Sequence, residues 1–404
     1  MQSQPSTTLW SRLREGILGL RKPVAPEADA AKLEEALVRL RKEVPAPVFW
    51  LFGKTQSGKT SVVRTLTGAD DAAIGNGFRP CTLTSRIYPF PSEAAPVITF
   101  LDTRGVDEPS YDATEDIARF NEQAHLVLVT CRLKDFATGR VKESLVRIRA
   151  ADPSRPVVLV LTCLHEAYPQ QQHPIPYPFD AGVYPPSVSD GPWPGDLIRL
   201  VREQTEEFRG LVDRVVPVDL TQADEGYAET EYGGAMLKQV LRETLPAAYR
   251  ATFRRVVEVD PNQLNDEHKR ARPVVLGYAT LAATAAGLPL TNWLVVPNIQ
   301  ERMLAELAAR SGRGGAATAF LEKVGGWSSR TNSRLRLTEF LRIVPVVGTA
   351  ANIRMAGKTT YALGLAFITY LHETRLGHAL TDAMIQKLYE KEFQMADTAW
   401  STTT

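Results

Sequence analysis

The chain has 404 residues, 44% of them hydrophobic and 23% charged, and its 47 basic and 46 acidic side chains give a net charge of +1. This composition is that of a globular protein of two or three domains, and it excludes disordered, collagen-like and disulfide-stapled chains. A balanced charge provides no overall field that attracts nucleic acid, so no nucleic-acid partner is predicted. Three cysteines without a CxxC pair, and a polar start without a secretory signal, predict a cytoplasmic protein.

Residues 1–45 are predicted to form an N-terminal helical segment. Within residues 9–21, four apolar residues recur at helical spacing beside three arginines. Such a stretch either lies on a membrane surface or packs as a short helix on its own domain, and both interpretations stay open. A second, charged amphipathic helix is predicted over residues 29–43, with Pro45 ending it.

Residues 46–245 alternate short apolar runs with helical segments. Most of the runs are continuously hydrophobic, as in strands covered by helices on both faces, so a doubly wound, mostly parallel α/β sheet is predicted. The predicted strands are 47–52, 84–90, 97–101, 125–131, 157–162 and 214–218. Residues 169–194 hold eight prolines in 26 positions and are predicted to be a surface loop inserted in this domain, with an extended ligand for a partner as the alternative.

Residues 246–404 are predicted to form an all-α, hydrophobic domain. Residues 273–300 contain no charged side chain, and a second apolar run, 343–371, is interrupted only by Arg354 and Lys358. Either these runs form a buried hairpin whose small residues allow close helix packing, or they enter a bilayer, where the two basic side chains would be costly.

The most specific motif is Gly53-Lys-Thr-Gln-Ser-Gly-Lys-Thr60, which matches G-x-x-x-x-G-K-[ST] at every fixed position between a predicted strand and a helix. Glycines let the backbone approach phosphate closely, and N–H groups at a helix N-terminus stabilise its charge. Lys59 is expected to reach the β- and γ-phosphates, and the Thr60 hydroxyl to coordinate Mg²⁺. The predicted phosphate-binding residues of this loop are Gly53, Gln56, Ser57, Gly58, Lys59, Thr60 and Ser61.

A second motif, Asp102-Thr-Arg-Gly105, directly follows the predicted strand 97–101 and lies 43 residues after Lys59. A nucleoside triphosphatase needs a carboxylate on the metal side of its phosphates at this place. Asp102 is therefore predicted to hold Mg²⁺ through water, and the amide of Gly105 to contact the γ-phosphate.

Together with Phe78-Arg-Pro-Cys-Thr-Leu-Thr-Ser-Arg86, these motifs resemble the small-GTPase superfamily, nearest to its bacterial Era/TrmE-like branch, over residues 47–245. The resemblance implies the fold of a P-loop G domain, with GTP or GDP and Mg²⁺ as ligands. It also implies a threonine that completes the Mg²⁺ shell when the γ-phosphate is present, for which Thr82 is favoured over Thr84. Mg²⁺-GTP would order residues 75–86 and 103–112, and hydrolysis would release them.

Two positions depart from the pattern of that superfamily. Val106 occupies the position of the usual catalytic glutamine, and a valine cannot orient the attacking water, so we expect slow GTP hydrolysis and assign no catalytic residue. The base motif [NT]-K-x-D is replaced by Thr162-Cys-Leu-His165, followed by Glu166. Thr162, His165 and Glu166 are the candidate base-binding residues, an ordinary strand-end turn is the alternative, and a last base loop is expected near 219–223.

Residues 260–390 resemble the hydrophobic helical domain of unknown function that follows some bacterial GTPases. The resemblance adds membrane lipid to the candidate partners and the inner membrane surface to the candidate locations. A homodimer and a protein effector stay open as well. The sequence thus predicts a GTP-binding protein whose nucleotide state switches a helical, membrane-facing domain. The alternatives are a structural or membrane-scaffolding protein with a static nucleotide module, and an ATPase.

Overall fold

The computed structural model describes residues 26–70, 74–75, 79–80, 85–103, 113–168, 172–257, 266–287, 292–325 and 350–400. The chain divides after Glu43 into two compact units. In the first unit, helix α2 (Pro26–Glu43) carries an exposed ion pair between Arg39 and Glu35, one helical turn apart at 2.6 Å. The predicted helix is present and starts three residues earlier than expected, at Pro26, while the helix predicted over 9–21 lies outside the described residues.

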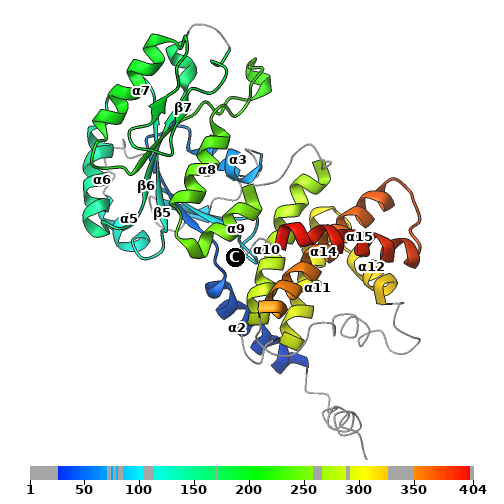
Figure 1. Cartoon of the computed structure of the whole chain (residues 1–404). Helices are drawn as coiled ribbons and strands as arrows, with labels where there is room; N and C mark the ends of the chain where they lie inside the picture. Colours follow the sequence, from blue (N-terminus) through cyan, green and yellow to red (C-terminus); the bar gives the residue numbers. More distant parts are fainter. Residues whose placement is uncertain are drawn as a thin grey trace, which may run out of the picture. The chain divides into compact units, whose positions relative to one another are not determined.

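The second unit contains a seven-stranded sheet with the order β2-β3-β4-β1-β5-β6-β9 (Figure 1). The strands are β1 (Val48–Gly53), β2 (Arg79–Pro80), β3 (Ser85–Phe90), β4 (Ile98–Thr103), β5 (Leu126–Arg132), β6 (Val157–Thr162) and β9 (Arg214–Pro217). Strands β4, β1, β5, β6 and β9 run parallel, whereas β3 is antiparallel to β4 and β2 is antiparallel to β3. The carboxyl ends of the parallel strands therefore share one edge, where ligands bind in sheets of this kind.

Helices cover both faces of this sheet, as the alternating side chains of β1 show. Trp50 points to one face, where its ring meets Phe120 edge-on at 5.5 Å, and Phe49 points to the other, where it meets Phe253 in the same way. The first face is covered by α5 (Ala113–Phe120), α6 (Gly139–Ala151) and α7 (Gly195–Glu207), and the second by α3 (Lys59–Thr67), α8 (Gly234–Thr244) and α9 (Ala247–Val257) (Figure 1). The predicted doubly wound, mostly parallel α/β sheet is confirmed.

All six predicted strands are present, with ends that differ from the prediction by no more than two residues. The prediction that residues 169–194 contain no regular element is wrong. Within them, β7 (Phe179–Asp180) pairs antiparallel with β8 (Ser187–Val188), and Phe179 is buried in the core. The prolines around this pair cannot donate backbone hydrogen bonds, but the paired residues can, which explains why only a short ladder forms. Two short 3₁₀ helices, η1 (Leu164–Ala167) and η2 (Ala223–Glu225), complete the loops at this end.

Beyond residue 265 the described residues are mostly helical, as predicted. They comprise α10 (Asp266–Gly287), α11 (Asn292–Arg310), α12 (Ala316–Gly325), α14 (Ala350–Arg375) and α15 (Asp382–Trp400). The apolar run 273–300 is shared between α10 and α11. Helix α10 packs closely against α14, since a Cβ on Gly364 would lie 2.5 Å from the Val275 side chain. Lys358 is buried with its amine 3.8 Å from the centre of the Phe393 ring, which stabilises the cation by a cation–π contact.

None of the described helices combines the length and the apolar character that crossing a membrane requires. The predicted boundary between a sheet domain and a helical domain near residue 246 stays a prediction.

Candidate functional site

The candidate phosphate loop connects β1 to α3, as the motif predicts. Gly58 caps α3 with φ 92°, and a Cβ there would lie 3.0 Å from Cγ2 of Thr162. A Cβ on Gly53 would lie 2.5 Å from the carbonyl oxygen of Thr130. Both fixed glycines of the motif are therefore required by the closeness of neighbouring strands, and Gly58 also by its left-handed backbone. The loop opens onto the N-terminus of α3, whose dipole and first N–H groups favour an anion.

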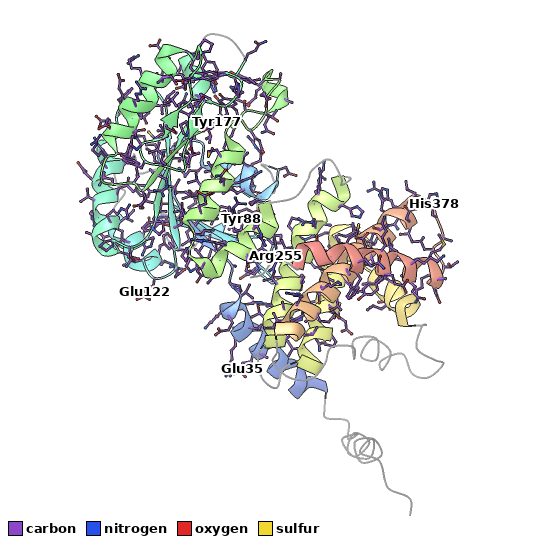
Figure 2. All side chains as sticks on the ribbon, in the orientation of Figure 1. Glu35, Tyr88, Glu122, Tyr177, Arg255 and His378 are labelled. Carbon is purple, nitrogen blue, oxygen red and sulfur yellow. The ribbon has the colours of Figure 1, made fainter. Side chains whose placement is uncertain are left out.

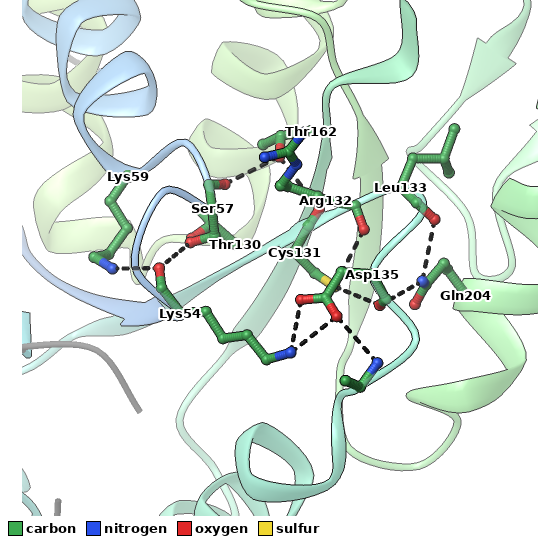
Figure 3. A network of polar contacts seen from close by, with 11 residues as sticks. Lys54, Ser57, Lys59, Thr130, Cys131, Arg132, Leu133, Asp135, Thr162 and Gln204 are labelled. Atoms are coloured by element: carbon green, nitrogen blue, oxygen red, sulfur yellow. Dashed lines mark hydrogen bonds and ion pairs between the residues drawn. The ribbon is translucent and has the colours of Figure 1, made fainter. Parts of the chain in front are cut away.

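Hydrogen bonds from the side chains of Ser57 and Thr162 hold the loop in place (Figure 3). The Ser57 hydroxyl is buried and lies 2.6 Å from Oγ1 of Thr130 and 2.8 Å from the carbonyl oxygen of Lys54. Thr162 at the end of β6 donates from its hydroxyl to the carbonyl oxygen of Ser57 at 3.0 Å. These contacts fix the shape of the loop from β5 and β6. Of the other predicted loop residues, Gln56 and Thr60 are exposed, and Gln56 adopts a left-handed φ of 59°.

The Lys59 side chain lies along this loop. Its amine donates to the carbonyl oxygens of Gly53 at 3.0 Å and of Lys54 at 2.8 Å (Figure 3). Gly53 and Lys54 are the first residues of the loop, so these two hydrogen bonds hold the ammonium group beside the loop that precedes the N-terminus of α3. The predicted role of Lys59 as a phosphate-contacting cation stays a prediction.

A second lysine, which the sequence analysis left unassigned, links the loop to its neighbour. Nζ of Lys54 lies 2.8 Å from both carboxylate oxygens of Asp135 in the loop after β5. Gln204, fully buried on α7, donates from its amide to the carbonyl oxygens of Leu133 and Asp135 (Figure 3). The phosphate loop is thereby connected through an ion pair to a rigid part of the core. Lys54 occupies a variable position of the motif, so the spacing gave no signal for this contact.

Asp102 lies at the end of β4, beside Leu51 of β1 and opposite Arg86 of β3. Its Oδ1 is buried and has no hydrogen-bond partner among the residues that the structure describes. Burial raises the pKa of this carboxyl group to about 6, although the nearby Lys59 and Arg86 lower it. A buried carboxylate with an unsatisfied oxygen next to the phosphate loop is chemically suited to a divalent cation, and Mg²⁺ commonly takes one or two carboxylates together with phosphate oxygens. The predicted Mg²⁺ residue Thr82, its alternative Thr84, and the predicted Gly105 and Val106 lie outside the described residues.

The candidate base end is formed by the loops after β6 and β9. Cys163 turns the chain with φ 56°, and His165 follows on η1. The carboxylate of Asp219 accepts the backbone N–H of His165 at 2.6 Å and lies 2.8 Å from Nδ1 of its ring. Hydrogen bonding to Asp219 raises the pKa of His165, while partial burial lowers it. The loop predicted near 219–223 does lie at this end, although the sequence gave no sign of the pairing.

Two of the predicted base residues have other contacts in the structure. The Glu166 carboxylate accepts from both Nε, at 3.1 Å, and Nη2 of Arg132. Thr162 is buried against the phosphate loop and Cys131. Of the three candidates, His165 has the most accessible side chain, with 34% of its surface exposed against 17% for Glu166, and Thr162 is buried.

The Pro-rich insertion supports this end from outside. The His173 ring lies between Tyr227 and Tyr232, each with its centroid 4.7 Å away and nearly parallel. Nδ1 of His173 is hydrogen-bonded to the Tyr168 hydroxyl at 2.7 Å. The hydroxyl of Tyr177, which Figure 2 labels, donates to the carbonyl oxygen of Pro217 at 2.6 Å. Burial lowers the pKa of His173, which favours the neutral form of its ring within the stack. The insertion therefore holds the loop that carries Asp219.

Neither a protein-family model nor a characterised protein sequence matches the chain. Among solved structures, a bacterial selenocysteine-specific elongation factor, EF-Sec, is 16% identical with a TM-score of 0.30, over 49% of this chain and 28% of that one. The G domain of the FeoB iron transporter from T. maritima is 17% identical (TM-score 0.28; 49% and 98% covered), and Toc33 from Arabidopsis thaliana, in complex with Mg²⁺ and GMPPNP, is 16% identical (TM-score 0.28; 52% and 91% covered). This chain thus spans 28% of the length of the elongation factor. At these identities and scores no family is shown.

Proposed function

We propose that the chain binds a Mg²⁺-nucleoside triphosphate, with GTP as the preferred nucleotide, at the edge where β1, β5 and β6 end. The observation that carries the proposal is the loop between β1 and α3. At Gly53 and Gly58 neighbouring residues leave no room for a side chain, and the loop leads into the N-terminus of α3. The Lys59 amine donates to the carbonyl oxygens of Gly53 and Lys54 at the start of the loop. Few ligands other than phosphate groups match a cluster of N–H groups with a lysine beside it.

In this proposal each candidate residue has one role. Gly53, Gln56, Ser57, Gly58 and Ser61 shape the loop and supply backbone N–H groups, and Lys59 contacts the β- and γ-phosphates. Thr60, Thr82 and Asp102 would hold Mg²⁺, which supplies charge neutralisation of the phosphate oxygens when it is bound. The unsatisfied Oδ1 of Asp102 supports its place in that set. Gly105 would contact the γ-phosphate. GTP is proposed as the nucleotide because the sequence motifs resemble those of the small-GTPase superfamily.

GTP hydrolysis, in which water displaces GDP from the γ-phosphorus, is proposed to be slow. Val106 carries no group that orients water, and no other residue is assigned to this step. A multiple-turnover assay of phosphate release, run with and without anionic lipid vesicles, separates a slow GTPase from a static nucleotide module. Release that exceeds one phosphate per protein supports turnover, and nucleotide binding without phosphate release supports the static module.

The nucleotide state is proposed to reach the helical part through the β3–β4 hairpin. Asp102 lies near one end of β4, and the turn at the other end contacts α10 and α11. There Arg310 donates to the carbonyl oxygen of Pro91 at 2.9 Å, and a Cβ on Gly277 would lie only 2.1 Å from the carbonyl oxygen of Ala95. A hairpin with the site at one end and a tight helix contact at the other is suited to transmit a displacement.

Substitution of Gly277 tests this route. Gly277→Ala places a methyl group against the Ala95 carbonyl and is expected to cost about 1–3 kcal/mol in the free energy of unfolding. It is also expected to abolish the difference in hydrogen exchange of α10 between the GDP and GMPPNP states. Gly315→Ala, whose added Cβ meets nothing within 4 Å, is the matched control. A nucleotide-dependent exchange pattern in α10 that is the same in Gly277→Ala and the wild type would contradict the route.

The binding proposal itself is tested by equilibrium titration of the full chain with GTP, GDP and ATP in the presence of Mg²⁺. Lys59→Ala is expected to weaken triphosphate binding by about a hundredfold or more, because it removes a charged donor from the phosphates. Lys387→Ala makes the same change at an exposed position on α15 and is expected to bind like the wild type. Lipid binding by the helical part stays a prediction from the sequence, which sedimentation with vesicles checks.

A further inference from the structure

The structure brings His165 to the same sheet edge as the phosphate loop. Thr162 joins the end of β6 to that loop through the carbonyl oxygen of Ser57, and His165 follows three residues later, after the left-handed turn at Cys163. A nucleotide with its phosphates at the N-terminus of α3 and its base across the ends of β5 and β6 therefore reaches the loops that carry His165 and Asp219.

Asp219 fixes both the orientation and the proton of the His165 ring. Its carboxylate is only 2% exposed, and one oxygen receives the backbone N–H of His165 and faces Nδ1. A buried acceptor at Nδ1 keeps the proton on that nitrogen, so the neutral ring presents a lone pair at Nε2. Among the described residues, no partner of Nε2 is found.

We propose that Nε2 of His165 is the single hydrogen-bond acceptor for N1–H of a 6-oxopurine base, and that Asp219 is its positioning residue. This inference rests on the proposed function, because a base lies here only when the loop holds the phosphates. Guanine and hypoxanthine both donate from N1, whereas adenine has a lone pair at N1 that would face the lone pair of Nε2. The pair thus selects 6-oxopurines against adenine.

A single acceptor leaves the 2-amino group of guanine without a partner. Glu166 and Glu225 are the other carboxylates beside His165. Oε1 of Glu166 accepts from Nε and Nη2 of Arg132, and Oε2 of Glu225 accepts the backbone N–H of Gln222 at 2.7 Å. Tyr227 flanks the His165 ring at 5.8 Å between centroids and offers no carboxylate. The site therefore distinguishes GTP from ATP but not GTP from ITP.

The test is equilibrium binding of GTP, ITP and ATP to the full chain with Mg²⁺ at pH 8. GTP and ITP are expected to bind within about threefold of each other, and ATP at least about tenfold more weakly, since two facing lone pairs leave polar groups unsatisfied. GTP binding more than tenfold tighter than ITP would show a second acceptor and overturn the inference. Equal affinities for GTP and ATP would overturn it too.

Variants separate this inference from the proposed function. His165→Phe removes both ring nitrogens and is expected to lower GTP and ITP affinity to that of ATP, while ATP binding, unchanged within about twofold, shows that the variant is folded. Glu207→Gln, which changes a partly exposed carboxylate on α7 that pairs with Lys142, is the control and keeps the wild-type ratio of GTP to ATP affinity. If His165→Phe keeps the ratio of GTP affinity to ATP affinity of the unchanged protein, the inference alone is overturned. If the unchanged protein binds none of the three nucleotides, the proposed function is overturned as well.

Asp219→Asn tests the positioning role. The loss of the acceptor charge frees the tautomer of His165, so the GTP-to-ATP ratio is expected to fall several-fold at pH 8. The pH at which that ratio is lost should also move to lower values, because the pKa of His165 is no longer raised by Asp219. A purely structural contact would change affinity for all nucleotides equally and leave the pH dependence of the ratio in place.

Discussion

The two ends of the candidate nucleotide site are built from different parts of the protein. The phosphate end is mostly backbone, formed by one continuous loop whose glycines are fixed by contacts to Thr130 and Thr162. The base end is made of side chains, His165 and Asp219, which lie 54 positions apart in the sequence. We infer that the first end sets the affinity for any triphosphate and the second sets the choice of base. The two properties should therefore respond to different substitutions.

The largest expected effect is at Asp102, on the metal side of the phosphate end. Burial raises its pKa from 3.8 to about 6, so the folded state binds the proton more tightly than the unfolded state. Folding stability of the nucleotide-free protein should therefore fall as the pH rises through this range and stay lower above it. Asp102→Asn is expected to remove this fall and to gain up to about 3 kcal/mol at pH 8.

Denaturant unfolding at pH 5 and pH 8 measures this change. The same variant should lose the Mg²⁺ dependence of GTP binding while keeping its GTP-to-ITP ratio, because the base end is untouched. An Asp102→Asn protein that is less stable than the wild type at pH 8 would contradict the account of an unsatisfied carboxylate.

At the backbone of the phosphate end, Gly58→Val is expected to weaken all nucleotides by about ten- to thirtyfold. The left-handed φ of 92° costs a side chain about 1–2 kcal/mol, and the added Cβ meets Thr162 at 3.0 Å. Gly139→Val is the matched control, because a Cβ there meets nothing within 4 Å. Titrations with GTP, ITP and ATP check that the ratios among the three binding affinities are unchanged. A change in the ratios would show that the two ends are not independent.

At the base end, the GTP-to-ATP ratio is expected to fall several-fold as the pH falls through the raised pKa of His165. Protonation of Nε2 turns the acceptor into a donor, which repels N1–H of guanine and donates to the lone pair at N1 of adenine. The charged groups that face the ring are Asp219, Glu166 and Glu225, and burial lowers the pKa of the neighbouring His173. Because Asp102 affects both nucleotides alike, the ratio isolates His165. A ratio that is constant from pH 5.5 to 8.5 speaks against an imidazole acceptor.

The smallest expected effect is at the ion pair that connects the phosphate loop to α7. Asp135→Asn is expected to weaken GTP, ITP and ATP equally, by about two- to fivefold, since partly exposed pairs contribute about 1 kcal/mol or less. Lys54→Met should have a similar effect, and the double variant should be no weaker than either single one. Glu207→Gln, which breaks an exposed pair with Lys142, is the control. Fully additive losses would show that the two residues act separately.

The same contrast explains what the sequence could predict. Most of the strands can be predicted because they are continuous hydrophobic runs buried on both faces, such as Val157–Thr162. The position of the loop between β1 and α3 can be predicted because a backbone site for an anion needs glycines at fixed spacing, and its phosphate-binding role stays a prediction. The fold class and the loop position therefore follow from local patterns alone.

Contacts between distant side chains could not be predicted in this way. The His165–Asp219 pair and the Lys54–Asp135 pair join residues that are 54 and 81 positions apart, and each residue type is common in loops. The short β7–β8 ladder was missed because the surrounding prolines hide the few residues that can pair. Glu166 was a candidate base ligand only from its position, and its contact with Arg132 depends on how β5 and β6 align.

The central claim is that the main chain between Gly53 and Ser61 binds a Mg²⁺-bound triphosphate. Hydrogen exchange of that segment, measured on the full chain with and without saturating Mg²⁺-GTP, tests it most directly. We expect the amides at the start of α3 to exchange at least about tenfold more slowly with nucleotide, because they become donors to phosphate oxygens. Nucleotide binding that leaves the exchange of these amides unchanged, or protects another part of the chain instead, would contradict the claim.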